Sequence, residues 1–571
     1  MVNGQIDAEE DLLAENQRLR ERLAQFERNG GFGLVWENIP ETVEQQLVDD
    51  VPVLKHVPSL DVPGEKPSPS PHVLIEGDNL HALHVLQATH RGKVDVIYID
   101  PPYNTGNRDF VYNDRFIDAE SAYRHSAWLS FMEKRLRLAR ELLKETGVIF
   151  ISIDDNEHSR LRLLLNQIFG DDDCLGDIAI VNNLRGRSDS SHFATAHESL
   201  LVFARDARKS TLNGFSLTDS QVSEYKMEDS ISRFKPETLR KRGSNSRRED
   251  APSLFYPIYW NEKNDSLSLD RASKEDIKIL PYLSNGDEGN WRWGRGTFLE
   301  RKDTELLVIR TKGSPTVYVK MRLEGRTSKP KTIWLDPKYD SSAGTRLIKQ
   351  LVTRSFNNPK PLEYITDILQ IGGGRDALVL DFFAGSGTTL NAVAELNAQD
   401  GGNRRCILVT NNENNVCREV TQPRIKAILT GDWASGPHDP LPGSLEFYTT
   451  DFFKRSKSLD QMRADIAEHT VDLIAIKDGA VKKSSSAGLH MLYGDQTTIA
   501  VVTAFDINDD ALTYANNAVR DGDSKIAYLF TWSDHGIESE LVDMWTGWDV
   551  HPLPAEMLAA LRRLAPKKES L

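Results

Sequence analysis

Apolar and polar positions alternate from Val73 onward in a pattern that predicts strands and helices in turn. The stretch HVLIEGDNLHALHVLQ predicts a strand, a turn and an amphipathic helix, and VDVIYI at 94–99 predicts a buried strand. A long helix is predicted over AYRHSAWLSFMEKRLRLARELLKE (122–145), and Gly147 separates it from the strand VIFISIDD (148–155). This alternation is typical of an α/β fold with a doubly wound, mainly parallel sheet.

Residues of about 181–350 break this alternation. They are polar, basic in places and rich in tryptophan and tyrosine, as in FYPIYW and WRWGRGTF. The α/β pattern returns near residue 361 with a helix, and ALVLDFFAGSGTTLNAVAEL and RRCILVTNNEN follow as strand, turn, helix and strand. We therefore predict an insertion within one α/β domain, and a smaller C-terminal α/β domain after a Pro/Gly-rich segment at 436–444. The predicted parts are an N-terminal helix (1–30), an arm or linker (31–72), the two halves of the α/β domain (73–180 and 351–440), the insertion (181–350) and the C-terminal domain (441–571).

Composition limits the class of protein. The 571 residues are 39% hydrophobic and 27% charged. No apolar run reaches the length of about 18 residues that a membrane span needs, and the first residues have no signal-peptide pattern. The three cysteines, Cys174, Cys406 and Cys417, lack the spacing of a disulfide framework or a zinc site. We therefore expect a cytoplasmic protein with no membrane partner and no metal.

Two further segments bear on partners. Leu12, Leu19 and Phe26 recur every seven residues, a coiled-coil-like seam that predicts either a homodimer or packing on the protein's own body. The net charge of −15 opposes binding to phosphates, but only the local potential at a binding groove matters. Within 226–248, eight lysines and arginines stand against three acids. This part of the insertion is therefore either a nucleic-acid contact or a solvated loop of mixed charge.

The sequence DPPY (100–103) places a carboxylate at the end of a predicted strand. Two prolines stop the strand after Asp100, and they hold this acid and the ring of Tyr103 on a stiff turn. In open α/β sheets, ligands bind at this carboxyl edge. On the tetrapeptide alone, Asp100 could instead be an acid that caps the next helix.

A glycine-rich turn, DFFAGSGTT (381–389), joins another predicted strand to a helix. Gly385 and Gly387 allow backbone N–H groups to approach a ligand, and the N-terminus of the following helix favours a negative group. The turn lacks both the Gly-Lys-Ser/Thr of a phosphate loop and the full dinucleotide fingerprint. By itself it indicates either a ligand loop or a tight strand–helix turn.

DPPY followed far downstream by this turn resembles the permuted β group of S-adenosylmethionine-dependent DNA amino-methyltransferases. EGDNLHAL, GVIFISIDDNE, HFATAHESLLVFAR (192–205) and FNNPKP (356–361) resemble further elements of that group. The order of the parts is most similar to the modification subunit of type III restriction–modification systems.

The resemblance implies a Rossmann-like methyltransferase fold in which the insertion is a target-recognition domain. It implies S-adenosyl-L-methionine as cofactor, double-stranded DNA as partner and N6 of adenine as the methylated atom. A type III-like assembly would also need an ATP-dependent restriction subunit as partner, since this sequence has no Walker-type loop.

The resemblance assigns roles to single residues as well. The implied catalytic residues are Asp100, Pro101, Pro102 and Tyr103. The implied cofactor-binding residues are Phe356, Lys360, Pro361, Asp381, Phe383, Ala384, Gly385, Ser386, Gly387, Thr388 and Glu413. The residues expected to bind DNA are Arg185, Arg187, Arg240, Lys241, Arg242, Arg247 and Arg248, with WRWGRG as a further candidate. The acid that usually binds the cofactor ribose is replaced within ILVTNNENN, so Thr410, Asn411 and Glu413 are all candidates for that role.

These residue types suit chemistry at an exocyclic amine. Asp100 and the Pro101 carbonyl can accept hydrogen bonds from both N–H groups of the amine and favour a tetrahedral nitrogen. Tyr103 can stack on a base that has been flipped out of the duplex. Cytosine N4 is an alternative target, an inactive DNA-recognition subunit is another, and protein glutamine is a third, although that family usually has Asn in place of Asp100. His197 and Glu198 either take part in the site or brace the insertion.

Overall fold

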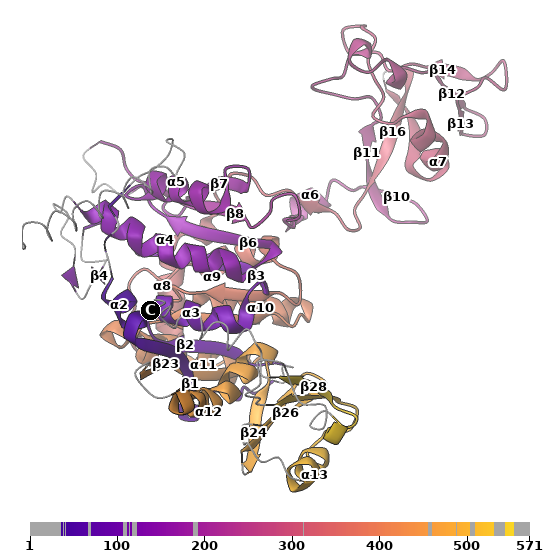
Figure 1. The fold of residues 1–571 in the computed structure, drawn as a ribbon. Helices are drawn as coiled ribbons and strands as arrows, with labels where there is room; N and C mark the ends of the chain where they lie inside the picture. The colour runs from indigo at the N-terminus through magenta and orange to yellow at the C-terminus, as the bar shows by residue number, and fades with distance from the viewer. Residues whose placement is uncertain are drawn as a thin grey trace, which may run out of the picture. The chain divides into compact units, whose positions relative to one another are not determined.

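The computed structural model describes residues 36–37, 39, 41–66, 70–106, 111–112, 115–116, 123–186, 192–311, 313–454, 459–486, 488–502, 509–529 and 543–552. The chain forms two compact units (Figure 1). The large unit combines the residues up to Asn213 with those from Lys331 onward, and the inserted unit is Gly214–Pro330. Each unit has a hydrophobic core of its own.

A ten-stranded sheet forms the centre of the large unit. Its strand order is β1 (Asp50–His56), β23 (Leu445–Lys454), β2 (His72–Glu76), β20 (Arg405–Thr410), β19 (Leu378–Asp381), β3 (Val94–Ile99), β6 (Leu143–Ile153), β8 (His197–Ala204), β7 (Cys174–Val181) and β18 (Ile333–Trp334). All neighbours from β23 to β6 are parallel, whereas β1 is antiparallel to β23, and β8 is antiparallel to β6 and β7. The predicted doubly wound, mainly parallel sheet is confirmed, and both predicted halves of the domain contribute to it.

Helices cover both faces of this sheet (Figure 1). Side chains alternate along a strand, so Ile97 and Ile99 of β3 pack in the core that includes residues of α3 and α4. The ring of Tyr98 between them meets Tyr364 of α9 edge-on, with centroids 6.4 Å apart. The helices of this unit are α2 (Thr42–Asp49), α3 (Asn79–His90), α4 (Arg124–Leu142), α5 (His158–Phe169), α8 (Ser341–Leu351), α9 (Leu362–Gly372), α10 (Thr388–Asp400), α11 (Gln422–Thr430), α12 (Leu459–Asp478) and α13 (Asp509–Asn517).

Two strands of the sheet come from segments predicted to lie beyond the two ends of the α/β domain. β1 lies in the predicted linker (31–72), and β23 lies in the predicted C-terminal domain (441–571). β1 contains Pro52, which has no N–H to donate, and the sheet tolerates it because β1 is an edge strand. The sheet therefore extends beyond both predicted domain borders.

The inserted unit is narrower than the predicted insertion of 181–350. β8 lies between β6 and β7 because its run Leu200–Ala204 is buried on both faces of the sheet. β18 and α8, near the other end of the predicted insertion, also belong to the large unit. The role of the insertion in target recognition stays a prediction, and it now concerns Gly214–Pro330 and the segments that lead into it.

Antiparallel strands and an aromatic core build the inserted unit. One sheet has the order β10 (Met227–Glu228), β11 (Arg233–Thr238), β16 (Ser314–Arg322), β15 (Leu306–Thr311), a second has β13 (Ser266–Ser268), β12 (Ile258–Asn261), β14 (Ile277–Ile279), and β9 (Phe215–Ser216) pairs with β17 (Thr327–Ser328). The helices are α6 (Asp219–Val222) and α7 (Arg295–Glu305), with 3-10 turns η2 (Arg248–Asp250) and η3 (Pro252–Leu254). Tyr256, Trp291 and Phe298 form the centre of the core. The first tryptophan of WRWGRG is thus a core residue, whereas Trp293 is half-buried.

A five-stranded sheet follows α12 in the large unit. Its order is β24 (Val481–Ser486), β25 (Leu489–Gly494), β26 (Thr497–Val502), β27 (Ser524–Leu529) and β28 (Asp549–Pro552). The remaining short elements are β4 (Val111–Tyr112), β5 (Arg115–Phe116), β21 (Asp432–Trp433), β22 (Gly436–Pro437), η1 (Pro58–Leu60), η4 (Pro337–Tyr339), η5 (Glu413–Asn415) and the π-helical turn η6 (Cys417–Thr421). No helix within the described ranges has the length and apolar character needed to cross a membrane. The predicted seam of Leu12, Leu19 and Phe26 lies outside the described residues.

Candidate functional site

Asp100 and Gly385 lie at the same edge of the large sheet. β3 and β19 are parallel neighbours, with Val96 opposite Val379, so their carboxyl ends point the same way. DPPY follows β3, and the glycine-rich turn follows β19. A pocket of about 700 Å³ is lined by both motifs and by FNNPKP. The two motifs, which lie in different halves of the α/β domain, therefore meet in one pocket.

The pocket includes most of the predicted cofactor residues. Gly387 and Glu413 are the two that do not line it. Eleven further lining residues were not predicted to bind cofactor or to be catalytic, and Asp154, Asn182, Glu198, Tyr339 and Ser341 are among them. Asp154 follows the strand VIFISI, so the rule that ligands bind at carboxyl edges could have found it. Asn182, Tyr339 and Ser341 lie in the predicted insertion and have no local sequence signal.

The DPPY turn is held from behind by buried side chains. Trp128 of α4 donates its indole N–H to the Pro102 carbonyl (2.7 Å). Asn104 has a positive φ of 57°, and its amide donates to the buried carboxylate of Glu157 (2.5 Å). The next described helix after this turn is α4, whose N-cap residue is Tyr123. Asp100 therefore does not cap that helix, and its carboxylate remains available to the pocket.

Asp100 belongs to a cluster of four polar side chains. Tyr103 Oη donates to Asp100 Oδ1 (2.8 Å), and Lys360 Nζ donates to Tyr103 Oη (2.5 Å). The same ammonium lies 3.2 Å from Asp100 Oδ1 and 2.9 and 2.8 Å from the two carboxylate oxygens of Glu198. One lysine is therefore shared by two carboxylates.

The pKa shifts in this cluster fix its protonation. Burial raises the pKa of Asp100, and Lys360 opposes that rise. Burial alone would lower the pKa of Lys360, but the carboxylates of Asp100 and Glu198 outweigh it and raise this pKa. Burial and the same carboxylates raise the pKa of Tyr103 well above its usual value. Lys360 and Tyr103 therefore stay protonated near neutral pH and act as donors.

The glycine-rich turn leaves room for a ligand at its backbone. Gly385 has φ +47° and Gly387 has φ +79°, in the left-handed region that favours glycine. Thr421 donates its hydroxyl to the Gly385 carbonyl (2.6 Å), and the Ala384 N–H donates to Val409 of β20 (3.1 Å). α10 begins directly after the turn. The backbone is thus fixed in a conformation that residues other than glycine rarely adopt.

A buried arginine lies behind this turn. Arg424 of α11 is 1% exposed, and its guanidinium donates to the hydroxyls of Thr388 (2.8 Å) and Ser386 (3.2 Å). Burial lowers the pKa of Arg424 to about 9, so it remains charged at neutral pH. Within the described part of the chain no carboxylate forms an ion pair with it. Its charge adds to the positive end of the α10 dipole, so this end of the pocket favours an anionic group.

Asp381 anchors the turn and leads to a prediction about pH. Its carboxylate accepts from the Thr389 hydroxyl (2.5 Å) and the Phe383 N–H (3.0 Å), and burial raises its pKa from 3.8 to about 7. Between these values the folded form keeps a proton that the unfolded chain has released, so this residue makes stability fall as pH rises, by about 1.4 kcal/mol per pH unit. We expect Asp381→Asn to remove this contribution. Urea unfolding of both proteins from pH 4 to 8 measures it, and equal slopes below pH 7 would contradict the prediction.

The candidates for ribose binding lie away from the pocket lining. Thr410 ends β20 and is 8% exposed, and its hydroxyl contacts the Asn411 carbonyl (3.3 Å). Asn411 and Glu413 are exposed in the loop that follows. None of the three lines the pocket that holds Asp100. The choice among them stays a prediction.

The basic residues predicted to contact DNA have varied surroundings. Arg248 forms an ion pair with Glu288 (2.7 Å), and the Arg240 guanidinium donates to the Tyr282 carbonyl (2.8 Å). Arg247 is 3.5 Å from Glu249, and Arg242 is exposed. Lys241 is half-buried in the inserted unit, Arg185 is exposed in the large unit, and Arg187 lies outside the described residues.

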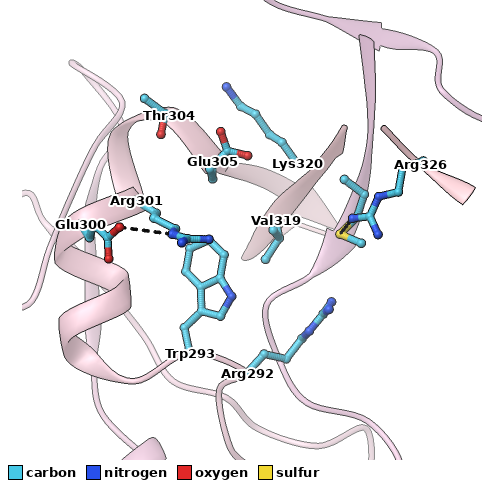
Figure 2. Close-up of a pocket in the computed structure, with 10 residues that line it drawn as sticks. Arg292, Trp293, Glu300, Arg301, Thr304, Glu305, Val319, Lys320 and Arg326 are labelled. Carbon is cyan, nitrogen blue, oxygen red and sulfur yellow. Dashed lines mark hydrogen bonds and ion pairs between the residues drawn. The ribbon is translucent and has the colours of Figure 1, made fainter. Parts of the chain in front are cut away.

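A second cluster of cations surrounds a pocket in the inserted unit. Of its residues, the sequence analysis had named only those within WRWGRG as candidates. Figure 2 shows Trp293 with Arg292, Arg301, Lys320 and Arg326 around this pocket, and Glu300 and Glu305 also line it. Arg292 pairs with Glu237 (2.9 Å), and Lys320 pairs with Asp229 (2.8 Å). Among the described residues, the one acid that pairs with Arg301 is the exposed Glu300, at 3.6 Å. Arg326 contacts the Arg322 carbonyl and the Met321 sulfur. Arg301 and Arg326 are therefore the cations of this pocket that carry the least compensated charge.

Comparison with known proteins gives consistent matches. A family model described as DNA methylase (N6_N4_Mtase) matches residues 94–421. The Mod subunit of the type III restriction-modification enzyme EcoPI of Escherichia phage P1 is 39% identical over 375 residues, which are 60% of this chain and 58% of that protein. The type II methyltransferase M.KpnI of Klebsiella pneumoniae is 36% identical over 342 residues, covering 59% of this chain and 79% of that protein. The match thus spans less than two thirds of the EcoPI Mod subunit.

Two of the solved structures that match the chain are described as DNA-modifying enzymes. A DNA modification methylase from Thermus thermophilus is 15% identical, with coverage of 66% of this chain and 98% of that chain and a TM-score of 0.31. The PvuII DNA methyltransferase, described as cytosine-N4-specific, is 10% identical, with coverage of 63% and 89% and a TM-score of 0.31.

Proposed function

Because the chain belongs to the DNA methylase family whose model matches residues 94–421, we propose that it transfers a methyl group from S-adenosyl-L-methionine to N6 of adenine in double-stranded DNA. The observation that carries the proposal is the meeting of Asp100 and Gly385 in one pocket, from adjacent parallel strands. An acceptor for an amine and a backbone cradle for a cofactor are thereby held side by side. An inactive DNA-recognition subunit would not need both.

The residues of the pocket fit the charges of this cofactor. The left-handed turn at Gly385 leaves space for a ligand where a Cβ would otherwise lie. The buried charge of Arg424 and the start of α10 suit the carboxylate of an amino acid, and the acids near Asp100 suit a sulfonium. Phe356, whose ring is 3.5 Å from the position of a Cβ on Gly385, would cover the cofactor from the FNNPKP side.

The chain's own groups would act mainly by position. S-adenosyl-L-methionine, when bound, supplies an electrophilic methyl group. Asp100 and the Pro101 carbonyl accept hydrogen bonds from the two N–H groups of the target amine and orient its lone pair toward that methyl group. Tyr103 is fixed by Asp100 and Lys360, so its ring offers a rigid face to a flipped base. No covalent bond to the protein is required.

Adenine N6 is the target proposed, with cytosine N4 as the alternative, because both are exocyclic amines that this arrangement can hold. An acid at the first position of DPPY supports adenine. The test is incorporation of a labelled methyl group into DNA by the purified protein, followed by mass spectrometry of the bases. N6-methyladenine is the expected product. N4-methylcytosine would overturn the target, and an unmodified duplex would overturn the activity.

We further propose that the inserted unit binds the DNA. The stretch Gly214–Pro330 contains 22 lysines and arginines against 18 acids, although the whole chain has a net charge of −15. The net charge of this unit is thus opposite in sign to that of the complete chain, which favours contact with phosphates here. Arg301 lies beside the half-buried Trp293, and Arg326 lies on the other side of the same pocket (Figure 2). Both arginines are exposed, and such a combination of cations with an aromatic ring suits nucleic acid.

Removing these two cations should change the salt dependence of DNA binding. We expect Arg301→Ala/Arg326→Ala to lower the slope of log affinity against log salt concentration by about 2, since each phosphate contact contributes about 0.9. Fluorescence anisotropy of a labelled duplex at several salt concentrations measures the slope. Arg310→Ala is the matched control, because Glu262 already compensates Arg310 with two contacts of 2.9 and 2.7 Å. An unchanged slope in the double variant would place the phosphate contacts elsewhere.

The assembly proposed is that of a modification subunit. We propose a homodimer through residues 1–28 because Leu12, Leu19 and Phe26 recur every seven residues. The similarity to type III Mod subunits supports a restriction subunit as a further partner. In that arrangement this chain supplies methylation and sequence recognition. The oligomeric state measured by light scattering, with and without residues 1–28, tests the dimer.

A further inference from the structure

The pocket around Asp100 is acidic. Among its described lining residues, Asp100, Asp154, Glu198 and Asp381 are acids, and Lys360 is the one lysine or arginine. Lys360 lies closer to both oxygens of Glu198 (2.9 and 2.8 Å) than to Asp100 (3.2 Å). Lys360 therefore contacts both carboxylates, and because two acids share one lysine, the cluster keeps a negative charge that is available to a ligand.

The sheet, rather than a loop, places Glu198. It is the second residue of β8, and it lies opposite Ile180 of the neighbouring strand β7. The next residue, Ser199, lies opposite Ile153 of β6, so the backbone is paired on both sides. The side chain is 8% exposed, and Lys360 is its ion-pair partner within the described residues. Because the backbone on both sides of Glu198 is paired in the sheet, its carboxylate is held at a fixed position next to Lys360.

From this arrangement we infer that Glu198 is a positioning residue whose charge neutralises Lys360, so that the pocket prefers a sulfonium cofactor to the neutral thioether that remains after transfer. The inference rests on the proposed function. In the transfer, a bond forms between the amine nitrogen and the methyl carbon, and the carbon–sulfur bond breaks with its electron pair on sulfur. The nitrogen then releases one proton to solvent, and the sulfur is left without charge.

Without Glu198 the charge balance of the cluster would change. The ammonium of Lys360 would be compensated by Asp100 alone, and an uncharged pair would face the incoming cation. Two charges separated by several ångströms in a partly buried site still interact enough to change an affinity by about tenfold or more. A neutral ligand of nearly the same shape would not feel that change. The preference between the two ligands therefore reports the charge of Glu198 and not the packing around it.

The experiment compares two ligands on the full chain. Isothermal titration calorimetry with S-adenosylmethionine and S-adenosylhomocysteine gives the ratio of their affinities for the unaltered protein, for Glu198→Gln and for Glu198→Asp. We expect Glu198→Gln to lower the preference for the sulfonium about tenfold, and Glu198→Asp, which keeps the charge, to retain most of it. Glu324→Gln, an exposed acid of the inserted unit, is the matched control and should leave the ratio unchanged. An equal change for both ligands in Glu198→Gln would overturn the inference.

A second variant, whose expected effect has the opposite direction, keeps the test valid if Glu198→Gln fails to fold. Lys360→Gln removes the positive charge, so the ratio should shift toward the sulfonium even where both affinities fall. A shift toward the thioether, or an unchanged ratio, would contradict the inference without any use of Glu198→Gln. If the unaltered protein binds neither ligand, the proposed function itself fails. If it binds both and neither variant changes the ratio, only the role of Glu198 fails.

Discussion

Asp100→Ala is expected to lower the rate of methyl transfer to DNA by about a hundred- to a thousandfold, far more than the fall of about tenfold in affinity for S-adenosylmethionine that losing one charge near the sulfonium would cause. The reason is that Asp100 contacts the amine most strongly as its nitrogen becomes tetrahedral, and loss of one preorganised group of this kind costs roughly 3–4 kcal/mol. The cofactor is expected to make its main contacts with the glycine-rich turn and FNNPKP instead. Labelled-methyl incorporation gives the rate, and calorimetric titration gives the affinity.

The controls separate chemistry from damage to the fold. Asp376→Ala removes an exposed acid that precedes β19, at the end opposite to the pocket, and should leave both measurements unchanged. Asp100→Asn keeps one acceptor oxygen and should retain more activity than Asp100→Ala. Near-normal turnover in Asp100→Ala would refute the mechanism proposed for the amine.

Gly385→Val is expected to produce the converse result, a loss of cofactor affinity of about 5- to 150-fold. A β-branched residue at φ +47° is strained by about 1–3 kcal/mol, so the free variant should relax the turn and must restore it when the cofactor binds. The new side chain also projects toward Phe356, into the space proposed for the ligand. Titration with S-adenosylmethionine measures the loss.

Two further variants identify the cause. Gly385→Asn tolerates the left-handed conformation better than valine does, so it should bind the cofactor more tightly than Gly385→Val if strain dominates. Gly374→Val adds the same side chain at an exposed position with nothing within 4 Å, and it should bind as the unaltered protein does. Unimpaired binding in Gly385→Val would remove the turn from the proposed cofactor site.

Much of the central sheet was predictable because its signals are local. VDVIYI and ALVLDFF are continuous apolar runs followed by turn residues, and parallel strands bring such ends to one edge, so Asp100 and Gly385 could be placed together. The edge of the sheet was not predictable in the same way. Pro52 within β1 argues locally against a strand, and only the position at an edge makes it acceptable. β23 follows a Pro/Gly-rich segment that is typical of a domain boundary.

The roles of single side chains depended on contacts between distant parts of the chain. Asp78 could be expected to cap α3, and its carboxylate accepts from the Leu80 N–H (2.7 Å), because capping is a matter of neighbouring residues. Glu198 and Lys360 are 162 positions apart, and no spacing rule connects them. Arg424 likewise has polar partners 33 to 38 positions away, which only the folded chain brings together.

The pairing of β3 with β19 also determines when the site can exist. Asp95 contacts the backbone of Leu378 across 283 positions, and the inserted unit is made between the two halves. During synthesis, one edge of β3 therefore stays unpaired until β19 has left the ribosome. The inserted unit is synthesised in this interval and already contains the residues of its own core. We expect the nascent chain to need protection over this interval. Truncation before β19 should leave an aggregation-prone fragment, whereas Gly214–Pro330 alone should stay in solution.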